Sequence, residues 1–162
     1  MHNPENERIK RDYFIYMKEA RRLGEHSIDC AAAALAKFEH YSKYRDFKRF
    51  HIQQAIGFKH KLSEQISERT GERLSRGTIF SALNALRAFF QWLSTQPGYR
   101  SHFSSADAEY FALSDKEARI AKAALERPVP TIEQIRHVLQ NMPAVTDIDL
   151  RNRAVVAFTL LT

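Results

Sequence analysis

The sequence has 162 residues, enough for one ordinary domain or for a small domain with part of a second. Hydrophobic residues make up 44% of it and charged residues 27%, while Gly and Pro number only five each. This composition disfavours both a disordered chain and turn-rich β folds. The formal charge is +6, and residues 1–127 carry all of it, with 22 Lys and Arg against 16 Asp and Glu. A basic first part beside a neutral end favours a polyanionic partner.

The sequence lacks the signals of membrane, metal and cofactor proteins. No apolar stretch approaches the roughly 20 residues of a membrane span, and the start has no signal peptide, so we expect a cytoplasmic protein without a membrane partner. The single cysteine, Cys30, excludes an internal disulfide, and the histidines form no metal-binding spacing. Because there is also no glycine-rich phosphate loop and no activated nucleophile, we expect no metal, cofactor, small-molecule substrate or catalytic residue.

Four amphipathic helices are predicted in residues 1–98. The first starts at the Asn3-Pro4 cap and closes at Gly24, and Ser27 caps the second. The third begins near Ile52 and ends near Gly71. Ser75 caps the fourth, which has the cleanest apolar period, formed by Ile79, Leu83, Leu86, Phe90 and Leu93. Short loops between four helices predict a compact all-α domain.

The apolar helical periodicity becomes weaker after Pro97-Gly98. Residues 99–130 are predicted to form a lightly packed linker, with a short turn at 106–113, a charged helical stretch at 115–126 and an extended segment at 127–130. A Thr131 capping box opens a helix that Pro143 stops. Asp147 or Asp149 then starts a last helix, apolar on most sides from Ala154, within a second domain of residues 131–162.

Basic and polar residues beside the predicted helix starts are the remaining functional signal. Helix N-termini with hydroxyls and arginines suit phosphate contacts, and polar residues further along a helix can reach base edges. The competing interpretation is an ordinary solvated helix face. The candidate DNA-binding residues are Lys43, Arg45, Lys48, Arg49, Arg73, Arg76, Thr78, Ser81, Asn84 and Arg87.

The order of these elements resembles a known family. A capped helix pair, a basic turn, a third helix and then LSRGTIFSALNALRAFFQWL resemble the SAM-like core-binding domain of tyrosine recombinases of the phage-integrase family. The later segments RPVPTIEQIRHVLQNMP and RNRAVVAFTLLT look like the first two helices of that family's catalytic domain. The resemblance covers essentially the whole chain.

The resemblance implies a function for the chain as a whole. It implies a site-specific recombinase that acts in DNA integration and recombination, with double-stranded DNA and further recombinase protomers as partners. Thr162 would begin the turn that carries the family's first catalytic arginine, so the catalytic set would lie beyond residue 162. Residues 1–162 are therefore expected to bind DNA without cutting it.

Two other functions stay open. One is a non-catalytic helical module for protein interaction or regulation. The other is a helix-turn-helix transcription factor, against which the long ERTGERLSR connection between the third and fourth helices argues.

Overall fold

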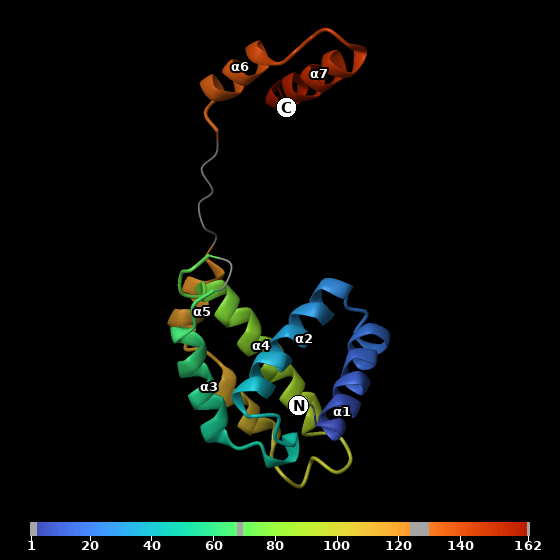
Figure 1. The fold of residues 1–162 in the computed structure, drawn as a ribbon, viewed down its shortest axis with the longest axis vertical. Coiled ribbons are helices and arrows are strands. Elements are labelled where there is room, and N and C mark those ends of the chain that lie inside the picture. Colours follow the sequence, from blue (N-terminus) through green and yellow to red (C-terminus); the bar gives the residue numbers. More distant parts are fainter. Residues whose placement is uncertain (1–2, 68–69, 124–129, 162) are drawn as a thin grey trace. The chain divides into compact units, whose positions relative to one another are not determined.

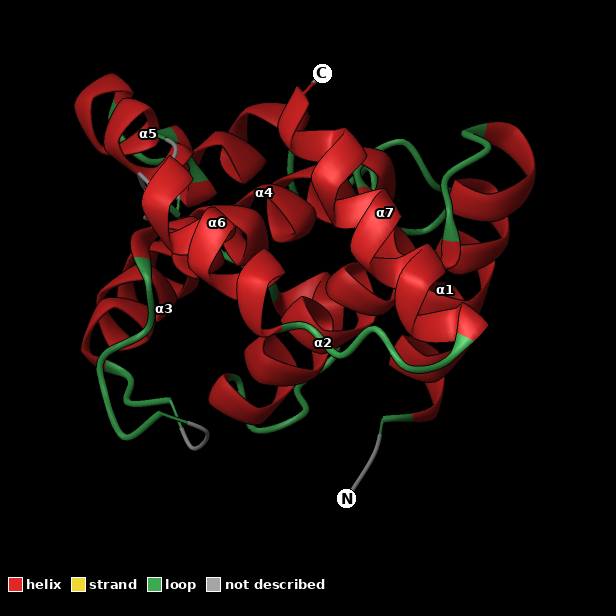
Figure 2. Cartoon of the chain, turned by 90° about the horizontal axis from the view of Figure 1, so that it is seen from above, coloured by secondary structure: helices red, strands yellow, loops and turns green. Residues whose placement is uncertain are grey.

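The chain consists of two helical units that are described separately. The computed structural model describes residues 3–67, 70–123 and 130–161, and it divides the chain at Ala123 into Met1–Ala123 and Ala124–Thr162. In the described residues, helices are the only regular elements apart from one isolated β-bridge between Ile66 and Arg73 (Figure 2). The predicted all-α class is confirmed. No helix in this part of the chain is both long and apolar enough to cross a membrane.

The first unit contains four α-helices of 12 to 18 residues and several shorter helical elements (Figure 1). Its elements are α1 (Pro4–Ile15), the π-helix η1 (Tyr16–Ala20), α2 (Glu25–Tyr41), the 3-10 turn η2 (Phe47–Arg49), α3 (Ile52–Glu64), α4 (Arg76–Leu93), the 3-10 helix η3 (Ser105–Phe111) and α5 (Asp115–Lys122).

The helix starts follow from local capping chemistry. The Asn3 side chain accepts hydrogen bonds from the backbone N–H groups of Glu5 (3.0 Å) and Asn6 (3.3 Å), which confirms the predicted start of α1. The predicted cap at Ser27 is wrong, because α2 begins two residues earlier, at Glu25, with Gly24 before it. Ser75 caps α4 as predicted, through a 3.1 Å bond from the Thr78 N–H.

The core of the first unit lies around α4 and is rich in phenylalanine. All five residues of the predicted α4 stripe are buried, so that prediction is confirmed. Phe38 of α2 lies at the centre, with ring centroids 5.3 Å from Phe58, 5.4 Å from Phe90 and 5.6 Å from Phe111. Such edge-to-face aromatic contacts add to the stabilisation that burial alone provides.

The segment after α4 belongs to the first unit. Residues 99–123 were predicted to be part of a lightly packed linker, but Phe103, Ala108 and Phe111 are buried in the core. Ala108 and Phe111 are buried because η3 packs along α4 and α3, and the Phe103 ring packs against Phe50 and Phe90. The predicted extended segment at 127–129 lies outside the described residues, as does the predicted turn at Thr162.

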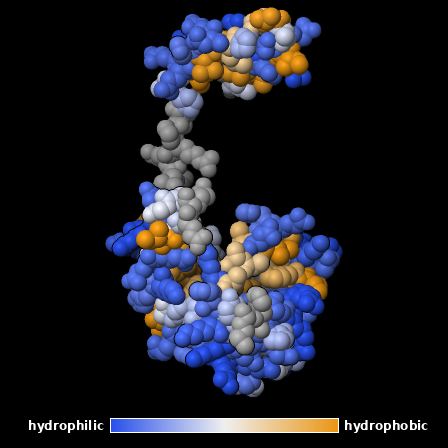
Figure 3. Space-filling model, viewed as in Figure 1, coloured by the Kyte–Doolittle hydropathy of each residue, from blue (hydrophilic) through white to orange (hydrophobic). Residues whose placement is uncertain are grey.

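The second unit is a helical hairpin of α6 (Ile132–Asn141) and α7 (Asp147–Leu161). Thr131 and Gln134 form the predicted capping box. α7 begins at Asp147, one of the two predicted starts, and the hydroxyl of the preceding Thr146 accepts from the Asp149 N–H (3.2 Å). None of the described side chains of this unit is buried, and orange apolar groups lie on its surface (Figure 3). Val155 and Phe158, for example, are 58% and 66% exposed.

Candidate nucleic-acid interface

The predicted basic turn between α2 and α3 has an unusual backbone. Lys43 and Tyr44 both adopt left-handed conformations, with φ values of 56° and 55°. The Tyr44 N–H donates to the Glu39 carbonyl oxygen (2.8 Å), which closes the end of α2. This turn leaves the side chains of Lys43 and Arg45 exposed at the surface.

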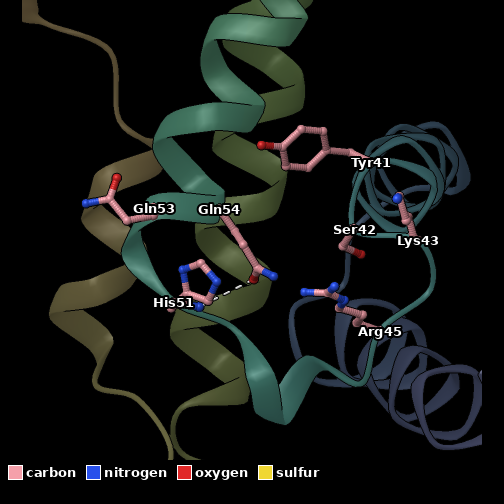
Figure 4. Close-up of a pocket in the computed structure, with 7 residues that line it drawn as sticks. All are labelled: Tyr41, Ser42, Lys43, Arg45, His51, Gln53 and Gln54. Atoms are coloured by element: carbon pink, nitrogen blue, oxygen red, sulfur yellow. Dashed lines mark hydrogen bonds between the residues drawn. The ribbon is translucent and has the colours of Figure 1, made fainter.

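Lys43 and Arg45 border a cleft between the end of α2 and the start of α3 (Figure 4). The cleft has a volume of about 280 Å³. In Figure 4, Lys43 and Arg45 come from the turn on one side, and on the other side Gln53 and Gln54 come from α3 and His51 comes from the residue before it. The Gln54 side-chain oxygen accepts from the His51 N–H (3.4 Å), which leaves its amide NH₂ group available to a ligand. The described lining residues are Tyr41, Ser42, Lys43, Arg45, His51, Gln53 and Gln54, and none of them is acidic.

Lys48 and Arg49 were predicted to join this cluster, but neither lines the cleft. Lys48 is half-buried, and its ammonium group lies 5.5 Å from the centroid of the Tyr99 ring, in a cation–π contact. Arg49 is exposed at the end of η2. The turn therefore presents Lys43 and Arg45 to the cleft and uses Lys48 for packing.

Arg73 and Arg76 form a second basic cluster at the start of α4. They line a hollow of about 550 Å³ together with Lys59 and His60 from the end of α3. The Lys59 ammonium group donates to the Ala112 carbonyl oxygen (2.9 Å), which anchors it at one edge. One acid, Glu117, also borders the hollow, and hydrogen bonds from Ser114 lower the pKa of its carboxyl group. The hollow is thus basic overall, with one carboxylate at its rim.

Polar residues of α4 line two hollows that α2 also borders. Thr78 and Ser81 line a groove of about 470 Å³ with Cys30 and Lys37 of α2. Asn84 borders the next hollow, of about 510 Å³, together with Arg21 and Trp92. Since α2 and α4 pack against each other, these two hollows lie along one seam, the α2/α4 seam.

Arg87 lies on the other side of α4. Its guanidinium group forms an ion pair with Glu109 of η3 (2.9 Å), and Glu109 also accepts from the Gln91 amide (2.7 Å). Successive residues of an α-helix are rotated by about 100° around its axis, so a residue three positions further along lies about 60° short of a full turn. Arg87, nine residues after Thr78, is therefore about 180° away from it. Arg87 therefore lies on the opposite side of α4 from Thr78, on the same side as Arg76.

Several residues near the candidates were not predicted. Lys37, His51, Gln53, Lys59 and His60 all line the hollows described above. The sequence contains a signal for them, because residues 51–63 contain two histidines and two lysines but no acidic residue. α3 joins the two basic clusters, and its 13 residues span about 20 Å at 1.5 Å per residue.

The arrangement suits binding of a polyanion. In the described part of the chain, no group of three or more His, Cys, Asp or Glu side chains could hold a metal ion. Two separated clusters of cations can neutralise two groups of phosphates along a duplex. Comparisons of this chain with protein-family models, with curated proteins and with solved structures found no match.

Proposed function

We propose that the first unit binds double-stranded DNA, and that the chain is the DNA-binding N-terminal part of a site-specific tyrosine recombinase. In this proposal the first unit is the SAM-like core-binding domain, and residues 1–162 bind DNA without cutting it. The observation that carries the proposal is the pair of basic clusters at the two ends of α3. The resemblance of LSRGTIFSALNALRAFFQWL and the later segments to that family supports it.

The two clusters fit a duplex in a simple way. Lys43 and Arg45 would contact phosphates near the start of α3, and Arg73 and Arg76 would contact phosphates near its end. One DNA strand carries a phosphate about every 3.4 Å along the axis, so about 20 Å corresponds to roughly six nucleotides. The hydroxyls of Thr78 and Ser81 would lie on the same bound duplex, along the α2/α4 seam.

Binding to duplex DNA over a range of salt concentrations tests this proposal. If binding neutralises about six phosphates, a plot of the logarithm of the affinity against the logarithm of the salt concentration has a slope of about −5. A flat response, or no binding at low salt, would refute DNA binding by this surface.

A chemical footprint locates the bound DNA. Cys30 is the only cysteine of the sequence, is exposed, and lines the α2/α4 seam. Bound duplex is expected to slow its alkylation by a maleimide. Introducing the cysteine elsewhere provides the control: a Cys30→Ser, Ala144→Cys variant carries its thiol on the second unit, where DNA is expected to give no protection. Equal alkylation of Cys30 with and without saturating DNA would remove the seam from the interface.

A helical protein-interaction module is the second candidate. The exposed apolar side chains of α6 and α7 favour it, because an apolar surface of this kind is typical of protein contacts. This candidate predicts self-association or partner binding that persists at high salt, which light scattering distinguishes from salt-sensitive DNA binding.

A further inference from the structure

A buried asparagine of α1 holds the basic turn in place. Asn6 is fully buried. Its side-chain NH₂ group donates to the Arg45 carbonyl oxygen (3.0 Å) and to the Glu39 carboxylate (3.1 Å), and its oxygen accepts from the Phe47 N–H (3.1 Å). All three hydrogen bonds that this side chain makes therefore reach the end of α2 or the turn that follows it.

Asn6 is itself held by an ionic network. Glu39, 1% exposed, also pairs with the Lys10 ammonium group, which in turn pairs with Glu7 at 2.7 Å. Asn3 adds a longer bond from its amide to the Tyr44 carbonyl oxygen (3.4 Å). One face of α1 is thus bonded to the backbone of the turn at residues 44, 45 and 47.

The turn needs such support because its backbone is strained. Two consecutive non-glycine residues in the left-handed region cost free energy that the surrounding structure must supply. Fixed bonds at residues 44, 45 and 47 lie directly around this strained pair. Without them, the segment from Lys43 to Arg49 would relax toward other conformations, and the cations of the cleft would separate.

We propose that Asn6 is a positioning residue for DNA: it preorganises the cleft of Lys43, Arg45 and His51 so that it can hold a backbone phosphate. The inference rests on the proposed DNA binding. Preorganisation raises affinity because the ordering cost is met during folding rather than during binding.

The first experiment measures duplex DNA affinity and its salt dependence for Asn6→Ala. The affinity is expected to fall about tenfold. The magnitude of the salt slope is expected to decrease by nearly 2, as if the two phosphate contacts of the turn were lost. In a Lys43→Ala, Arg45→Ala background, Asn6→Ala is expected to cause no further loss. Ser94→Ala is the matched control, since Ser94 is also a buried polar residue but bonds only within the end of α4.

The second experiment does not depend on DNA. Trypsin cleaves after lysine and arginine, so the turn offers it Lys43, Arg45, Lys48 and Arg49. Asn6→Ala is expected to be cut at these sites at least tenfold faster than the unsubstituted protein, with no matching increase at Arg8 or Arg11 in α1. Mass spectrometry of the first fragments identifies the sites. Asn6→Ser keeps a small neutral polar side chain that is too short to reach all three partners and adds no charge beside Glu39, and it replaces Asn6→Ala if that variant does not fold.

The outcomes separate the two proposals. If the unsubstituted protein does not bind DNA, the proposed function fails, and faster cleavage of the turn still establishes that Asn6 fixes it. If the protein binds DNA and Asn6→Ala binds equally well with an unchanged salt slope, the positioning role is refuted. Equal cleavage of the turn in both proteins refutes it as well.

Discussion

Lys43 adopts a strained backbone conformation. Its φ of 56° is unfavourable for every residue with a Cβ atom, while glycine tolerates it. Lys43→Gly is therefore expected to be more stable than Lys43→Ala by about 1 kcal/mol. Urea unfolding of the two variants measures the difference. This order reverses the usual preference for alanine, so an alanine variant of equal or greater stability would show that the turn is not strained.

Tyr13 gives the fold a defined sensitivity to alkali. Burial, with the nearby Tyr16 adding to it, raises the pKa of Tyr13 to about 12. Tyrosine in the unfolded chain ionises near pH 10, so stability that is fully present below pH 10 is lost as the pH rises toward 12. Burial lowers the pKa of Lys10, but its bonds to Glu39 and Glu7 outweigh this and raise it, which acts in the same direction.

In Tyr13→Phe, the free energy of unfolding is expected to decrease less steeply with rising pH. Some decrease remains, because Lys10 still contributes. Urea unfolding from about pH 9 to about pH 12 checks the expectation. An unchanged slope in Tyr13→Phe would mean that the hydroxyl of Tyr13 reaches water in the native state.

At the level of elements, α2 and α3 meet through Gly57. A methyl group on Gly57 would overlap the Tyr41 hydroxyl, which lines the basic cleft. The Tyr41 ring packs against Phe58, with ring centroids 5.4 Å apart, and this contact opposes its displacement. Gly57→Ala is therefore expected to destabilise the unit by about 1–2 kcal/mol through overpacking. In a Tyr41→Phe background the overlap disappears and alanine favours the helix, so the same substitution is expected to be neutral or stabilising. Thermal unfolding of the four proteins tests this, and equal effects in both backgrounds would contradict the contact.

The elements show what a sequence can and cannot predict. The α4 stripe and its Ser75 cap were predictable because burial and capping follow local spacing. The packing of η3 was not, because Phe103 and Phe111 form no helical period and their burial depends on contacts distant in sequence. Asn6 was missed for a similar reason: its partners lie 33 to 41 residues away.

The candidate site was predicted in part. Lys43 and Arg45 share a cleft and Arg73 and Arg76 share a hollow, as clusters in the sequence suggested. Arg87 pairs with Glu109 of η3, and repeated steps of three residues carry it away from the helix face of Thr78. No local rule indicates that Lys48 turns to Tyr99, which is 51 positions further along the chain.

At the scale of the whole molecule, the core and the basic clusters belong to the first unit. A fragment of residues 1–123 contains every buried side chain of the core and all ten candidate contacts. It is expected to unfold cooperatively and to bind duplex DNA within about twofold of the full chain, because the second unit adds no net charge. Calorimetry and a binding titration check both points. A fragment that folds but loses DNA binding would place the interface on the second unit.

The salt dependence of duplex DNA binding, compared between two double variants, tests the central claim most directly. Lys43→Ala, Arg45→Ala removes two cations from the cleft, while Arg11→Ala, Lys18→Ala removes two exposed cations of α1 and η1. The net charge changes equally. The cleft variant is expected to reduce the magnitude of the salt slope by nearly 2, and the control to leave it almost unchanged. Equal slopes in the two variants, or no binding by the unsubstituted protein, would contradict a DNA interface built on this cleft.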